Sequence, residues 1–198
     1  DRENLTMNGE ATVELDRDAS HLNAMYQVVT GAPYPGNDDP YNISVDGVGV
    51  PRHIAKNFSS FMQGSKSTKG VAHSVINHYK RKATEVKTPK DSDIKKYEEY
   101  VEFKKNIKPT DIANAILDKH PKVANYYNNG KSYGDFIGCW ESDIVFEVVM
   151  ELTKRGVPCL TVYDSFIVPL QYEELVNSIK DTMPYVDRRG LDKELFKK

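Results

Sequence analysis

Two aspartates and a pair of cations are the residues of this chain whose types and spacing could do chemistry. Asp164 interrupts an apolar run at residues 160–169, where β-branched and aromatic side chains favour extended backbone. The run predicts two short strands joined at the polar pair Asp164-Ser165, with Pro169 closing the second strand. A buried, unpaired carboxylate is costly, so a charge at this tip needs compensation. A divalent metal would supply it, and an ordinary solvated turn is the alternative.

A second group of carboxylates stands at the end of another predicted strand. Residues 11–16 alternate between apolar and polar side chains, and the strand ends at Asp16. Asp18 follows, and Ser20 is predicted to cap the next helix. Asp16 and Asp18 are therefore either metal ligands or charges that stabilise a helix start through its dipole. Taken alone, this pattern leaves both interpretations open.

Residues 52–64 predict a helix with two different faces. Pro51 suits the first position of a helix, and Gly64 suits its end. Polar and charged side chains recur on one side at helical spacing. They are Arg52, Lys56, Ser59, Ser60 and Gln63. Two cations one turn apart, continued by hydroxyls and an amide, would suit a polyphosphate; a solvated helix face is the alternative.

The elements that must position these residues are mostly helical. Further helices are predicted at residues 20–31, 71–83, 91–105, 111–119, 123–129, 140–156 and 172–183. Thr110 is predicted to cap one of them, and the helix at 140–156 leads directly into the hairpin that carries Asp164. The sequence predicts an α+β chain, mostly helical, with a small antiparallel sheet.

Composition narrows the class of protein. The net charge is −2, but residues 66–108 hold twelve Lys and Arg against six Asp and Glu, which predicts a basic surface. Cys139 and Cys159 lack the spacing of a zinc site or a disulfide framework. No apolar stretch approaches the roughly 20 residues that span a bilayer. We expect a protein of the cytoplasm without a membrane partner, and a piece of a longer protein or a subunit, since Asp1 is not an initiator Met.

Carboxylates on two strand ends and a cationic helix form a recurring chemical set. Mg²⁺ prefers hard oxygen ligands and leaves room for substrate phosphates. A pair of ions ~3.5–4 Å apart can activate an attacking hydroxyl and stabilise the leaving group. Arg and Lys at i and i+4 can bind the triphosphate. The combination predicts nucleotidyl transfer.

Three motifs in order resemble the polymerase fold shared by single-subunit RNA polymerases of the phage and mitochondrial type and by family A DNA polymerases. Asp-Arg-Asp-Ala-Ser, starting at Asp16, is similar to motif A. The resemblance makes Asp16 a metal ligand, with the carbonyl of Arg17 as a helper. A second register, closer to the DNA polymerase version, would make Asp18 the ligand instead.

Motifs B and C follow in the chain. Arg52-x-x-x-Lys56 resembles motif B, and Gln63-Gly64 stands where the RNA polymerases have Tyr-Gly, one residue closer to the Lys. The resemblance assigns substrate binding to Arg52, Lys56, Gln63 and Gly64. Tyr163-Asp164-Ser165 resembles motif C, normally His-Asp-Ser. By this resemblance Asp164 is the other metal ligand, Tyr163 lies near the primer end, and Asp16, Asp164, Lys56 and Tyr163 are catalytic. Trp140-Glu-Ser-Asp-Ile is also similar in order to what precedes motif C.

The resemblance implies a right-hand polymerase with a palm at about residues 1–30 and 109–198 and fingers at about 48–108. Residues 69–108 match nothing in the family, and the thumb and amino-terminal region are missing, so a second polypeptide is expected to supply them. The implied function is that of a DNA-directed RNA polymerase using two Mg²⁺ ions, a DNA template, an RNA product and nucleoside triphosphates. Its location would be the cytoplasm, that of the host cell if viral, with an organelle as the alternative. A DNA polymerase or primase-polymerase of a phage or plasmid and a non-catalytic nucleic-acid-binding subunit are the alternatives.

Overall fold

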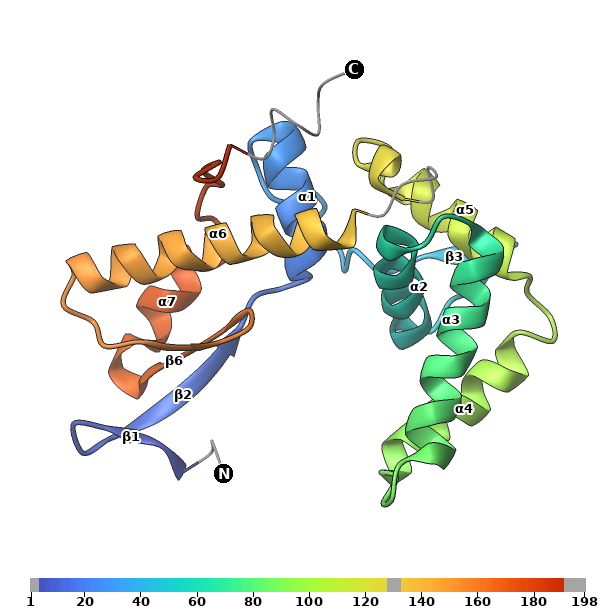
Figure 1. Ribbon diagram of the computed structural model, residues 1–198, viewed down its shortest axis with the longest axis horizontal. Coiled ribbons are helices and arrows are strands. Elements are labelled where there is room, and N and C mark those ends of the chain that lie inside the picture. The colour runs from blue at the N-terminus through green and yellow to red at the C-terminus, as the bar shows by residue number, and fades with distance from the viewer. Residues whose placement is uncertain (1–3, 128–132, 191–198) are drawn as a thin grey trace. The chain divides into compact units, whose positions relative to one another are not determined.

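The structure, a computed structural model, describes residues 4–127 and 133–190. It is 55% helical with a small curled antiparallel sheet, so the predicted mixed and mostly helical architecture is confirmed. The described chain forms two compact units (Figure 1). Unit 1 comprises residues 1–35 and 136–198, and unit 2 comprises residues 36–135. No helix in the described part of the chain is long and apolar enough to cross a membrane.

Unit 1 contains a four-stranded sheet in the order β1-β2-β6-β5, in which all neighbours are antiparallel. Its elements are β1 (Thr6–Met7), β2 (Glu10–Asp16), α1 (Ser20–Thr30), α6 (Gly134–Lys154), β5 (Leu160–Val162), β6 (Ser165–Pro169), the 3-10 turn η4 (Leu170–Tyr172) and α7 (Glu173–Ile179). The hairpin of β5 and β6 lies beside β2 (Figure 1). Strand β1, which is not among the predicted strands, forms the edge of the sheet next to β2.

The core of unit 1 covers one face of this sheet. Leu15 pairs in register with Phe166, so both side chains lie on the same face. Helix α6 packs Val148 and Leu152 against them, and α7 adds Val176. All five side chains are buried, and together they fix the strand ends on which Asp16 and Asp164 stand.

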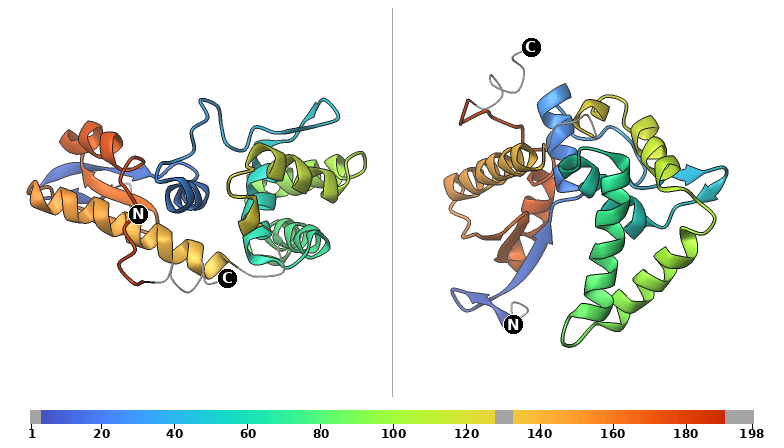
Figure 2. Two further views of the ribbon diagram at one scale, coloured as in Figure 1. Left: turned by 90° about the horizontal axis from the view of Figure 1, so that it is seen from above. Right: turned by 45° about the vertical axis from the view of Figure 1, so that its right-hand side comes forward.

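Unit 2 is a group of helices with one short hairpin. Its elements are β3 (Ser44–Val45), β4 (Val48–Gly49), α2 (Arg52–Gly64), α3 (Thr68–Lys80), the π-helical segment η2 (Arg81–Glu85), α4 (Asp91–Phe103), α5 (Pro109–Lys119) and the 3-10 turn η3 (Ala124–Tyr126). The β3–β4 hairpin projects from the helices (Figure 2). Its turn at Asp46-Gly47 has positive φ at both residues, which suits a two-residue hairpin loop. These two short strands are not among the predicted elements.

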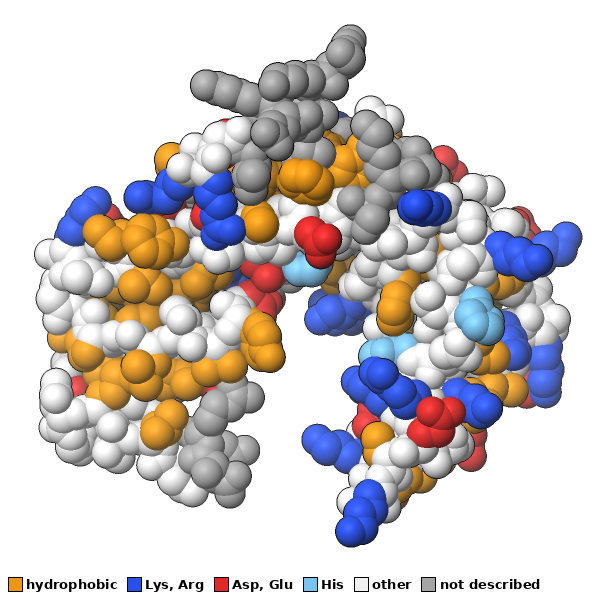
Figure 3. Space-filling model, viewed as in Figure 1, with side chains coloured by type: hydrophobic (Ala, Val, Ile, Leu, Met, Phe, Trp, Pro, Cys, Tyr) orange, Lys and Arg blue, Asp and Glu red, His pale blue; other side chains and the backbone are white. Residues whose placement is uncertain are grey.

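Helix α5 belongs to unit 2, because it contacts α2, α3 and β3. Unit 2 thus extends to residue 135, whereas the resemblance drew its boundary near residue 108. Lys and Arg side chains gather on the face of α3 and α4 that Figure 3 shows, as the charge distribution predicted.

Several predicted helix ends shift for identifiable reasons. Ser20 does not cap α1: Ala19 precedes the helix with a φ of 43°, and Ser20 accepts a hydrogen bond from Arg17 instead. Thr110 does not cap α5, since the helix begins at Pro109, whose missing N–H is tolerated at the first position. The predicted helix at 123–129 is a single 3-10 turn where it is described, and residues 128 and 129 lie outside the described part.

A candidate two-carboxylate site at the strand ends

Asp16 and Asp164 lie at the same end of two neighbouring strands. Asp16 is the last residue of β2 and pairs in register with Ser165, the first residue of β6. The Ser165 hydroxyl donates a hydrogen bond to Oδ1 of Asp16. The Arg17 N–H donates to the carbonyl of Asp164 over 3.2 Å. The structure therefore brings together the two aspartates that stand far apart in the sequence.

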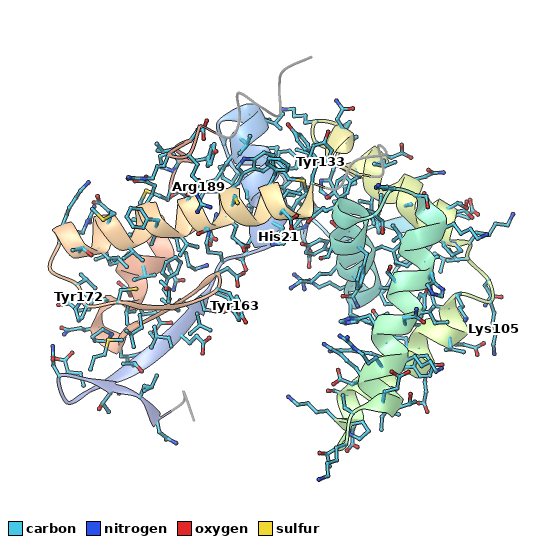
Figure 4. All side chains as sticks on the ribbon, in the orientation of Figure 1. His21, Lys105, Tyr133, Tyr163, Tyr172 and Arg189 are labelled. Carbon is cyan, nitrogen blue, oxygen red and sulfur yellow. The ribbon has the colours of Figure 1, made fainter. Side chains whose placement is uncertain are left out.

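The turn of the hairpin differs from the predicted one by one residue. Tyr163 and Asp164 form the turn, while Ser165 is buried and belongs to β6. Tyr163 adopts a φ of 56°, an unusual conformation for an aromatic residue, and its side chain is 91% exposed. It stands at the tip of the hairpin (Figure 4). The prediction placed the turn at Asp164-Ser165 because Ser is a common turn residue, but the bond to Asp16 keeps Ser165 in the ladder.

Arg17 is a buried cation directly behind Asp16. Its Nε donates to the carbonyl of Lys180 over 2.9 Å, and Nη1 reaches the Ser20 hydroxyl at 3.3 Å. Burial lowers the pKa of Arg17, and the nearby charges of Asp181, Glu141 and Asp164 oppose that shift. Because two of its nitrogens are held by hydrogen bonds, the guanidinium anchors the end of β2 and places positive charge near Asp164 and Glu141.

Asp18 lies two residues past the strand and is tied to a different part of unit 1. Its N–H donates to Oδ1 of Asp181 over 3.1 Å, and its carbonyl accepts from Asn23. Its side chain is exposed. Only Asp16 of the two candidates is in register with the hairpin that carries Asp164.

A half-buried carboxylate to which the sequence motifs assign no role lies next to this group. Glu141, near the start of α6, forms an ion pair with His21 of α1 over 3.5 Å. Burial raises the pKa of Glu141, but hydrogen bonds from His21 and Ser20 and the charges of His21 and Arg17 together lower it. Figure 4 shows His21 by the first turns of α6. The only signal was the position of Glu141 in the Trp-Glu-Ser-Asp stretch ahead of the hairpin.

Asp143, two residues further along α6, is the second carboxylate to which the sequence motifs assign no role. Its Oδ1 accepts from Nε of Arg189 over 3.0 Å, and Arg189 also reaches Cys139 and Ser142. The other oxygen, Oδ2, is buried and has no hydrogen-bond partner among the residues that the structure describes. Arg189 therefore fastens the segment after α7 onto α6.

In unit 2, only part of the predicted polar side of α2 is exposed. Lys56 and Ser60 face solvent, whereas Ser59 and Gln63 are each 2% exposed. The Ser59 hydroxyl bonds the Tyr127 hydroxyl at 3.0 Å, and the carbonyl of Gln63 accepts from the N–H of Tyr133. The prediction of a continuous polar face is wrong, because these tyrosines cover its far edge.

Arg52 and Gly64 stand at the two ends of α2. The Arg52 guanidinium pairs with Asp39 and lies 5.3 Å from the ring centre of Tyr41. Asp39 also accepts from the Tyr41 N–H, and its pKa is lowered: burial raises it, but these hydrogen bonds and the charge of Arg52 outweigh that effect. Gly64 is exposed, and a Cβ placed there would meet nothing within 4 Å.

The donors at the strand ends fit Mg²⁺ in kind. Within the described residues, no group of three or more His, Cys, Asp or Glu could hold a metal ion. Mg²⁺ is commonly held by one or two carboxylates, with waters and substrate phosphates completing its shell, so a protein cluster of that size is not required. Asp16, Asp164 and the Arg17 carbonyl offer hard oxygens of this kind.

Comparison of the chain with models of protein families, with curated proteins and with solved structures found no match.

Proposed function

We propose that the chain is the palm-and-fingers core of a DNA-directed RNA polymerase that transfers nucleotides by a two-metal mechanism. The observation that supports this most directly is the pair Asp16 and Asp164 at neighbouring strand ends, with Ser165 bonded to Asp16. The resemblance to motifs A and C assigns the same two residues to the metal site. Asp16 and Asp164 are separated by most of the chain, so their spacing in the sequence does not by itself place them on neighbouring strand ends.

In this proposal each residue has a separate task. Asp16, Asp164 and the Arg17 carbonyl would hold Mg²⁺, which when bound would activate the 3′ hydroxyl and stabilise the leaving pyrophosphate. Asp16 is preferred to Asp18 because it is in register with the hairpin. Tyr163, exposed at the hairpin tip, would contact the primer end. The buried Arg17 guanidinium holds the end of β2 in place.

The proposal assigns the triphosphate to Lys56, whose side chain is exposed on α2. Arg52 is the second cation, and it would have to exchange Asp39 for a phosphate. The buried side chain of Gln63 is poorly placed to contact a sugar, so ribose selection would depend on other groups. Gly64, without a side chain, leaves space beside the helix end.

Extension of a primed DNA template by Asp16→Asn and Asp164→Asn proteins tests the proposal. Each variant should fold normally and lose extension almost completely, while Asp18→Asn, the matched control, should keep it. Lys56→Ala should weaken nucleotide use far more than template binding, because many cations hold a nucleic acid and one triphosphate contact is local. Unchanged function in Asp164→Asn would identify a non-catalytic subunit.

The choice of nucleotide separates the RNA polymerase from its nearest alternative. Ribonucleotides should be used in preference to deoxyribonucleotides on the same primed template. A preference for deoxyribonucleotides would identify a DNA polymerase or primase-polymerase, and equal use of both would leave the RNA polymerase assignment without support.

A further inference from the structure

Unit 2 contains an apolar pocket that no part of the proposed catalytic machinery uses. The pocket has a volume of about 640 Å³ and lies between the β3–β4 hairpin and the C-terminal end of α4. Val45, Val48, Phe103 and Ile107 provide its apolar lining. This size falls in the range of roughly 300–1,000 Å³ that is usual for pockets which enclose ligands.

One side of this pocket exposes an apolar side chain to water, which is unfavourable. Val45 and Ile107 are buried, but Val48 is 53% exposed at the lip of the pocket. A turn of two residues, Asp46-Gly47, would hold the hairpin equally well with a polar residue at position 48. An exposed apolar side chain beside a pocket is the pattern expected of an interaction site.

The charged residues that line the pocket are all acidic. Asp46 on the hairpin side and Glu99 and Glu102 on the α4 side contribute to its lining, which contains no Lys or Arg. The adjoining hollow on the other side of the hairpin shares Asp46 and adds Asp111 and Asp118 from α5, together with Lys119, which pairs with Asp38. This acidic surface is conspicuous because residues 66–108 as a whole are basic.

The local partners of the glutamates leave most of that negative charge available. Lys105 meets Glu102 at 2.5 Å, but both side chains are more than half exposed, so the pair is weak and exchangeable. His53 lies 3.8 Å from Glu99. Burial lowers the pKa of His53, which disfavours its charged form. A cation brought by a ligand would therefore meet carboxylates without a strong competitor.

We propose that this pocket binds a segment of a second polypeptide in which one or two apolar side chains stand between Lys or Arg residues. The apolar side chains would enter between Val48 and Phe103. Carboxylates occur on both sides of the apolar lining, which suits cations on both flanks of an anchor better than a single small cation. The inference goes beyond the proposed catalytic function and needs none of its residues.

Two fluorescein-labelled synthetic peptides test this in the absence of nucleotides and template. One has the sequence Lys-Leu-Trp-Leu-Lys and the other Glu-Leu-Trp-Leu-Glu, and fluorescence anisotropy measures their binding to the full chain. The basic peptide should bind at least about tenfold more tightly, since opposite charges attract and like charges repel across an interface. Equal binding of the two peptides would overturn the proposal.

Paired variants locate the site. Val48→Ser should weaken the basic peptide about fivefold through lost apolar contact, whereas Val86→Ser, at another exposed valine, should not. Glu99→Gln with Glu102→Gln should weaken it about fivefold, and Glu85→Gln with Glu98→Gln, the same charge change outside the pocket, should not. If both members of a pair behave alike, the peptide binds elsewhere and the proposal fails.

Two further outcomes separate this inference from its alternatives. Asp164→Asn protein should bind the peptide normally, so a failure of the polymerase proposal would leave this result unchanged. Sedimentation should show the chain alone as a monomer. A dimer that Val48→Ser dissociates would mean that a second copy of this chain covers the pocket, and it would overturn the proposal of a different polypeptide.

Discussion

The hydroxyl of Ser165 is the side-chain contact that joins the two aspartate-bearing strand ends. It donates to Asp16 from the first residue of β6, next to Asp164. A carboxylate that holds a metal ion needs a fixed orientation, and groups that hydrogen-bond to metal ligands commonly supply it. The burial of Ser165 keeps water from taking over this bond.

Ser165→Ala should therefore reduce activity without unfolding the protein. The Mg²⁺ concentration for half-maximal primer extension should rise about tenfold, and the free energy of unfolding should fall by about 1 kcal/mol. Titration of activity with Mg²⁺ and urea denaturation measure the two effects. Ser178→Ala, which removes a hydroxyl bonded only to the Leu175 carbonyl, is the control and should leave the Mg²⁺ requirement unchanged. An unaltered Mg²⁺ requirement in Ser165→Ala would contradict the role of Asp16 as a metal ligand that Ser165 orients.

Glu141 should make unit 1 sensitive to acid. Its pKa in the folded protein lies below the ordinary value of 4.5, so its ionised form stabilises the fold above that pH. The contribution is lost as the pH falls through the lowered pKa. The free energy of unfolding of the natural protein should exceed that of Glu141→Gln by about 1 kcal/mol near pH 7.

Chemical denaturation of both proteins between pH 7 and pH 3 measures this difference. It should stay constant at neutral pH and shrink below about pH 4.5, where the carboxyl of the unfolded chain takes up its proton first. The same substitution at the exposed Glu174 controls for the loss of one carboxylate. A difference that grows towards low pH would contradict the assigned direction of the shift.

At the scale of elements, the sequence predicted the strand and helix ends that depend on neighbouring residues. The alternation that ends at Asp16, the helix bounded by Pro51 and Gly64, and the stop at Gly156 depend on periodicity, proline and glycine, and all three are found. The turn at Tyr163 and the burial of Ser59 and Gln63 depend on partners distant in the chain. The hydrogen bond from Ser165 to Asp16 sets the turn, and the tyrosines after α5 cover Ser59 and Gln63. A single sequence does not show which distant residues form such contacts.

Helix α6 offers a matched test of one such local signal. Gly156 follows the helix with a φ of 71°, whereas Gly138 lies inside it, and a Cβ at either position would meet nothing within 4 Å. Only backbone conformation distinguishes the two sites. Gly156→Ala should therefore destabilise the protein by about 1 kcal/mol, and Gly138→Ala should stabilise it by about 0.5–1 kcal/mol. Thermal and urea denaturation measure both, and equal effects at the two sites would show that the helix does not end as described.

At the scale of the whole molecule, the chain leaves unit 1 after residue 35 and returns at residue 136. Unit 2 is therefore a continuous insertion, while unit 1 needs two distant segments. The motif resemblance predicted a division of this kind, with a palm at about residues 1–30 and 109–198 and fingers at about 48–108, but the second boundary lies at residue 135. Unit 2 is compact because its helices contact one another, as α5 contacts α2 and α3. The composition of the chain does not reveal such contacts.

The fragment of residues 36–135 should fold by itself. Its helices α2, α3, α4 and α5 contact one another within the unit, and they bury the core side chains Phe58, Val75, Tyr100 and Ile112. The fragment has the size of an ordinary domain. The fragment should give a helical circular dichroism spectrum and one cooperative thermal transition.

In the full chain, Leu152→Ala removes a buried side chain of unit 1 and should lower the stability of that unit by about 2–5 kcal/mol. Because Leu152 lies outside the fragment, the transition of unit 2 in that variant should remain at the temperature of the isolated fragment. A fragment without cooperative unfolding would mean that unit 2 depends on unit 1 for its core.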